Sequence, residues 1–115
     1  MFDFFKKKKN GPDFSEIDSR EKAETAAKDG SLVSILMMPE VFGGVPVGPN
    51  VIFVPAWVAE QKERIDLGTV LPLAQEGKIT RYEAHPAYKG DSFVPSSITI
   101  HAHTPGDFSV TIEIW

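Results

Sequence analysis

Residues 97–115 read SITIHAHTPGDFSVTIEIW, two runs of alternating apolar and polar residues on either side of a Thr-Pro-Gly-Asp sequence. Alternation with a period of two residues is typical of a β-strand that buries one face and exposes the other. The two runs are adjacent in the chain, and the Pro-Gly pair between them favours a tight turn. They therefore predict an antiparallel hairpin whose apolar face consists of Ile98, Ile100, Ala102, Val110, Ile112 and Ile114.

The pairing register of this hairpin must keep the apolar residues together, because a slip of one residue turns every side chain to the other face. A two-residue turn at Pro105-Gly106 would set His101 opposite Val110, which contradicts the pattern. A three-residue loop of residues 105–107 satisfies it. The predicted pairs are Thr104 with Phe108, Ala102 with Val110, Ile100 with Ile112, Ile98 with Ile114, His103 with Ser109, His101 with Thr111 and Thr99 with Glu113.

Three helices are expected before the hairpin. The first is capped by Ser15 or Asp18 and ends near Lys28, with Gly30 just beyond it. A second begins at Pro55 and runs through Asp66. A third and shorter helix, residues 70–75, is expected after a break at Leu67-Gly68, with Thr69 as its cap. The face predicted for the second helix consists of Trp57, Val58, Gln61 and Ile65.

Three more strands complete the predicted fold. Apolar runs that end at a proline indicate buried strands at residues 32–38 and 51–54, and a weaker alternation indicates a strand at 79–84. With strands grouped in the C-terminal half and helices segregated from them, the order predicts a single small α+β domain. We expect a mainly antiparallel sheet of about five strands, two helices plus a short third helix, and the C-terminal β-hairpin.

Charge and composition restrict the function. The chain of 115 residues has a net charge of −4, but residues 1–10 hold four lysines and one aspartate, so the remainder carries −7. An acidic body repels a phosphate backbone, which argues against nucleic acid as a partner. The absence of cysteine excludes disulfides and thiolate ligands and fits a reducing compartment. No segment has the length of a membrane span, and we expect a cytoplasmic protein.

Residues 1–12 are expected to form a tail attached to a domain of residues 13–115. Phe2, Phe4 and Phe5 precede four lysines at residues 6–9. This opening resembles that of many small bacterial cytosolic proteins, among them some toxin-immunity proteins. Aromatic and basic residues together also suit a membrane surface, although three aromatics make a weak anchor. Membrane attachment is therefore our third hypothesis.

A possible metal site lies on the polar face of the hairpin. His101 and His103 project from one strand to the same side, an arrangement that can supply two ligands to zinc or another divalent metal. Glu113, diagonal to His101, could be a third ligand, and His85 a fourth if its strand lies alongside. The alternative is a solvated polar face, because exposed strand positions are commonly Thr, His, Ser or Glu. Metal binding is our second hypothesis.

Our first hypothesis is a non-enzymatic, adaptor- or immunity-like module that binds another protein and needs no cofactor. None of Ser92, Ser96 and Ser97 lies in a Gly-x-Ser-x-Gly elbow, and the glycines of residues 43–48 match neither a P-loop nor a dinucleotide motif. The glycine- and proline-rich loop of residues 41–50 is expected to present an apolar contact surface. Its candidate residues are Val41, Phe42, Val45 and Val47. An exposed edge strand could also pair with a second copy of the chain.

Overall fold

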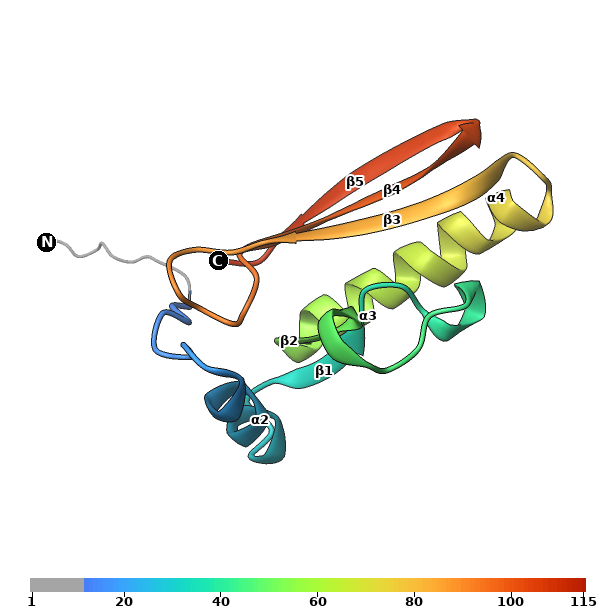
Figure 1. Ribbon diagram of the computed structural model, residues 1–115. Helices are drawn as coiled ribbons and strands as arrows, with labels where there is room; N and C mark the ends of the chain where they lie inside the picture. The colour runs from blue at the N-terminus through green and yellow to red at the C-terminus, as the bar shows by residue number, and fades with distance from the viewer. Residues whose placement is uncertain (1–11) are drawn as a thin grey trace, which may run out of the picture.

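The computed structural model describes residues 12–115. In chain order its helices and strands are α2 (Arg20–Lys28), β1 (Val33–Leu36), β2 (Val51–Val54), α3 (Ala56–Ile65), α4 (Leu71–Gln75), β3 (Ile79–Ala87), β4 (Ser97–Pro105) and β5 (Asp107–Glu113). The predicted α+β class is confirmed. The five strands form two antiparallel sheets rather than one, with β1 and β2 in the first and β3, β4 and β5 in the second (Figure 1). Apart from Pro12, the predicted tail lies outside the described residues.

The C-terminal hairpin forms with its apolar residues on one face, but the predicted register is wrong by two residues. Ile98 pairs with Ile112, Ile100 with Val110 and Ala102 with Phe108. On the polar face His101 pairs with Ser109 and His103 with Asp107. A shift of two residues keeps each side chain on its predicted face, so the alternation alone does not exclude it.

A contact outside the hairpin accounts for the observed register. The turn consists of Thr104, Pro105 and Gly106, and the Gly106 N–H donates to the carbonyl of Lys78, 2.9 Å away, at the start of β3. A Cβ atom at Gly106 would lie 2.8 Å from the same carbonyl oxygen, so only glycine allows this approach. The turn is thus fixed against the third strand, a partner that the hairpin sequence does not reveal.

The sheet places β4 in the centre, between β3 and β5. Strand β3 extends to Ala87, beyond its predicted end at Ala84, and includes Pro86. Proline is tolerated there because β3 is an edge strand, where one row of N–H groups has no partner strand. Glu83 lies directly opposite His101 in the pairing of β3 with β4.

Helix α2 begins later than predicted. Its N-cap is Ser19, whose hydroxyl oxygen accepts the Lys22 N–H at 3.1 Å, rather than Ser15 or Asp18. The predicted end is correct, since the helix stops at Lys28 and Gly30 follows with φ of 88°.

The second and third predicted helices form one continuous run. A π-helical turn, Asp66–Val70, joins α3 to α4 where a break at Leu67-Gly68 was expected. Pro72 lies just after this turn and cannot donate to the carbonyl four residues before it, that of Gly68. A wider turn at this point accommodates the proline, and the Leu71 N–H bonds to Asp66 O, five residues back.

The main core lies between the three-stranded sheet and the α3–α4 run, which Figure 1 shows extending beneath it. The buried positions of this helical run are Val58, Lys62, Asp66 and Val70, spaced at four residues. Trp57, predicted to face the core, is 45% exposed. A smaller core forms where α2 covers Phe53 of β2 and Leu32. None of the helices between residues 12 and 115 has the length and apolar character needed to cross a bilayer.

Candidate functional site

The outer face of the three-stranded sheet brings two histidines together. His101 and His103 alternate with Ile100 and Ala102 along β4, so both imidazoles project away from the core. Their ring centroids are 4.4 Å apart and the ring planes differ by 27°, a stacked arrangement. Because both side chains are half-buried on the central strand, the two rings are held side by side.

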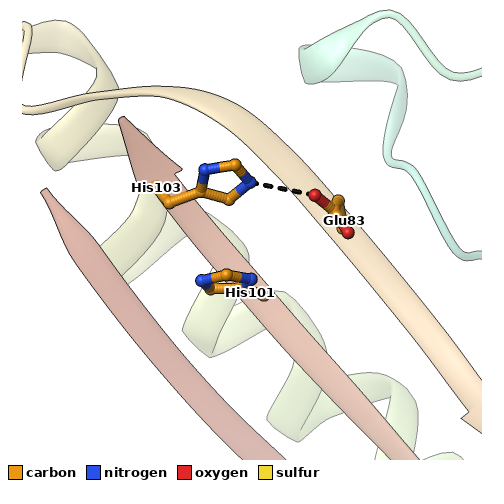
Figure 2. Close-up of side chains that lie close together, drawn as sticks. All are labelled: Glu83, His101 and His103. Atoms are coloured by element: carbon orange, nitrogen blue, oxygen red, sulfur yellow. Dashed lines mark hydrogen bonds and ion pairs between the residues drawn. The ribbon is translucent and has the colours of Figure 1, made fainter. Parts of the chain in front are cut away.

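Glu83 of β3 is the carboxylate nearest to this pair. One of its oxygens accepts a hydrogen bond from His103 Nε2 at 2.9 Å, and the other accepts one from His85 Nε2 at 3.0 Å. One ligand atom from each of Glu83, His101 and His103 can be chosen so that all three lie within 4.8 Å of one another. Figure 2 shows the three side chains converging from the two neighbouring strands.

The turn and β5 orient the two rings. His101 Nε2 donates to Asp107 Oδ1, 2.6 Å away on β5. His103 Nδ1 lies 2.8 Å from the hydroxyl oxygen of Thr104, the next residue. Thr104 has φ of 71°, a left-handed conformation that is unfavourable for a β-branched residue and costs roughly 1–3 kcal/mol. One nitrogen of His101 and, with the Glu83 bond, both nitrogens of His103 therefore have a hydrogen-bonding neighbour.

The other two predicted ligands lie farther along the sheet. Glu113 pairs with Ser97, four residues along β5 from Ser109, the partner of His101, which corresponds to roughly 13 Å. His85 pairs with Thr99 and contacts the group only through Glu83. Sequence reasoning missed Glu83 because its position depends on the pairing of β3 with β4. The sequence does show that Glu83 alternates with Tyr82 and Ala84, which would place Glu83 on the opposite face of the strand from those two residues.

The electrostatics of Glu83 follow from these contacts. Hydrogen bonds, first from His85 and then from His103, lower the pKa of Glu83 to about 2. The carboxylate is therefore ionised at neutral pH and can accept from an imidazole N–H or ligate a cation.

A second candidate region is an apolar groove between α3 and the loop that connects β1 to β2. Its volume is about 510 Å³, and Val41, Pro46 and Leu67 are among its lining residues. Val41, Val45 and Val47 of the loop are 52%, 56% and 62% exposed. Phe42, predicted to belong to the same surface, instead packs against Tyr82 with ring centroids 4.9 Å apart and the ring planes tilted by 37°.

A buried polar network adjoins the groove, and no sequence pattern pointed to it. Lys62 and Asp66 both line the groove, although they are only 3% and 4% exposed, and their side chains pair at 2.6 Å. The Tyr82 hydroxyl donates to the second Asp66 oxygen at 2.7 Å and accepts from Lys62 at 3.1 Å. Burial lowers the pKa of Lys62, while its pairing with Asp66 opposes that shift. Burial and the Asp66 charge raise the pKa of Tyr82.

Comparison of this chain with protein-family models, curated proteins and solved structures finds no match.

Proposed function

We propose that this protein is a non-enzymatic binding module whose groove receives an apolar segment of another protein that also carries basic residues. The observation that supports this most is the exposure of three valines on one short loop that borders an open apolar groove. An adaptor or immunity-like role in a bacterial cytoplasm is consistent with such binding.

The loop between β1 and β2 exposes apolar side chains beside the groove. Scattered apolar side chains are normal on a protein surface, but a contiguous patch beside a groove is typical of a contact site. Val41 lines the groove directly, and Val45 and Val47 flank Pro46, which also lines it. Covering these side chains would remove from water an apolar surface that the fold itself does not cover.

The groove also carries acidic side chains. Glu40 and Glu63 line the groove, and among residues 12–115 neither forms an ion pair. The lysine in the groove, Lys62, is already paired with Asp66. The groove is therefore net negative, and a segment with lysine or arginine beside its apolar residues matches it better than an acidic one.

The loop is held in place before any partner arrives. The Asn50 side chain accepts the Met38 N–H at 2.8 Å and donates to the carbonyls of Met38 and Val45 at 3.1 and 2.9 Å. These three bonds fix the apolar wall of the groove against β1. Binding to a pre-organised surface loses less conformational entropy, which favours affinity.

Titration with a short leucine–lysine peptide tests the proposal. We expect the backbone amide resonances of Val41, Ala59 and Leu67 to shift, and we expect Val41→Asp to weaken binding by roughly tenfold or more. The matched control is Tyr88→Asp, because Tyr88 is 46% exposed but does not line this groove. A leucine–glutamate peptide should bind at least roughly tenfold more weakly than the lysine peptide.

Two outcomes would contradict the proposal. If neither peptide shifts the groove resonances, the groove is not a docking site for such segments. If Tyr88→Asp weakens binding as much as Val41→Asp does, the peptide binds elsewhere on the acidic surface.

A further inference from the structure

We propose that Glu83, His101 and His103 form a binding site for a divalent transition-metal ion, of which zinc is the best fit. The site lies on the outer face of the three-stranded sheet and shares no residue with the groove between α3 and the β1–β2 loop. The two proposals are therefore independent of each other.

The distances between the ligand atoms suit one small ion. Zinc bonds histidine nitrogen and carboxylate oxygen at about 2.0–2.2 Å, so tetrahedral ligand atoms stand roughly 3.3 Å apart. In this structure the three ligand atoms lie within 4.8 Å of one another, and His103 Nε2 is already 2.9 Å from Glu83 Oε2. Because the two rings are stacked with planes 27° apart and an imidazole nitrogen binds a metal in the plane of its ring, the rings must turn to aim both nitrogens at one ion.

The Nδ1 atom of His101 is available to bind a metal ion. Because a carboxylate only accepts, the hydrogen bond to Asp107 Oδ1 places a proton on His101 Nε2 and leaves a lone pair on Nδ1. Figure 2 shows the two nitrogens of this ring on opposite sides, one toward β5 and the other toward β3. A carboxylate that holds the second nitrogen of a ligating histidine is the usual outer partner in zinc sites.

His103 can exchange a proton for a metal without losing its other contact. Its Nε2 now donates to Glu83, and a metal would take the place of that proton. The Nδ1 atom would then carry the proton and donate to the Thr104 hydroxyl, which can act as donor or acceptor. The left-handed Thr104, with φ of 71°, is the residue that brings this hydroxyl to the ring. Backbone strain at a residue that positions a ligand is typical of functional sites.

The donor set selects the kind of ion. Two imidazoles and one carboxylate suit zinc and its neighbours in the transition series, whereas magnesium and calcium prefer oxygen ligands alone. Three protein ligands leave a fourth position of a tetrahedral ion open. Because the His101 side chain is 38% exposed and that of Glu83 is 46% exposed, this position would face solvent and hold water or a small anion.

Zinc titration of the full chain tests the proposal by calorimetry and by histidine NMR. The chain has three histidines and no cysteine, so the resonances can be followed one by one. We expect one zinc per chain, with shifts of the His101 and His103 ring resonances, and no such shifts with magnesium. His101→Ala, His103→Ala and Glu83→Gln should each weaken zinc binding by roughly tenfold or more, and Asp107→Asn by a similar factor.

The control uses Glu113, a predicted ligand that lies four residues farther along β5 than the partner of His101. Glu113→Gln should keep the wild-type affinity, and circular dichroism should show that every variant is folded. Unshifted His101 and His103 resonances at saturating zinc would overturn the proposal. An affinity that depends on Glu113 as much as on Glu83 would overturn it too, because zinc would then be held elsewhere on the polar face.

Discussion

At the scale of single residues, the least expected feature is a lysine in the core. Lys62 is 3% exposed; Asp66, one helical turn later, balances its charge, and the Tyr82 hydroxyl accepts a hydrogen bond from it. A buried charge is stable only while its partners remain, because the lost hydration must be replaced by hydrogen bonds and charge pairing. The three polar groups therefore act as one unit inside an otherwise apolar interface between α3 and β3.

Removing one member of this unit should cost more than removing the ion pair as a whole. Lys62→Met leaves the Asp66 carboxylate buried without its cation, and we expect a loss of about 3–5 kcal/mol in the free energy of unfolding. The double variant Lys62→Met/Asp66→Leu should recover much of that loss. Urea denaturation at neutral pH measures both, and a double variant less stable than the single one would contradict this account.

At the scale of elements, one glycine of the loop between β1 and β2 lies too close to another backbone segment to carry a side chain. A Cβ atom at Gly44 would lie 1.7 Å from the carbonyl oxygen of Met38, which cannot move without breaking the bonds to Asn50. The sequence marked this loop as irregular but could not show which glycine is required, because the requirement arises from the close approach of two backbone segments.

We expect Gly44→Ala to displace this loop and destabilise the protein by roughly 1–3 kcal/mol. The matched control is Gly68→Ala in the π-helical turn, where an added Cβ meets no atom within 4 Å and φ is not positive. Alanine in a helical turn should stabilise by about 0.5–1 kcal/mol. Thermal unfolding of both variants checks the contrast, and equal effects of the two substitutions would rule it out.

The helices and strands also show which structural features could be predicted from short stretches of sequence. The helix end at Lys28 and the inward isoleucines of the hairpin could be predicted, because each depends on residues close together in the chain. The π-helical turn before Pro72, the split into two sheets and the pairing of Glu83 with His101 could not. The split into two sheets and the pairing of Glu83 depend on contacts between segments distant in sequence, and so the candidate metal site was only half predicted. The π-helical turn is local, but the sequence pattern did not distinguish it from a break between two helices.

At the scale of the whole molecule, acid should weaken the fold gradually. Hydrogen bonds lower the pKa values of the exposed carboxyl groups of Asp13, Asp18, Asp29 and Glu83, that of Glu83 from 4.5 to about 2. A carboxyl group whose pKa is lower in the folded state stabilises it above the unfolded-state pKa, and this contribution is lost as the pH falls through the folded-state pKa.

We expect the stability of the wild type to fall as the pH is lowered from 4.5 to about 2. Glu83→Gln lacks the Glu83 contribution, so its stability should lie below that of the wild type at neutral pH and approach it near pH 2. Urea unfolding of both proteins across this range measures the difference. A difference that does not change with pH would show that the hydrogen bonds of Glu83 to the histidines do not stabilise the fold.

The hairpin register determines which residues of β4 and β5 meet on the outer face of the sheet. Sliding β5 along β4 by two positions would keep the apolar side chains on the inner face, although Ala102 would then pair with Val110 instead of Phe108, and it would give every outward residue new neighbours. His101 now lies opposite Ser109, and in the slipped arrangement it would lie opposite Thr111. The alternation of apolar and polar residues therefore allows either alignment, and the link from Gly106 to Lys78 distinguishes the observed one. Redesigning that turn offers a way to rearrange the outer surface while the same residues face inward.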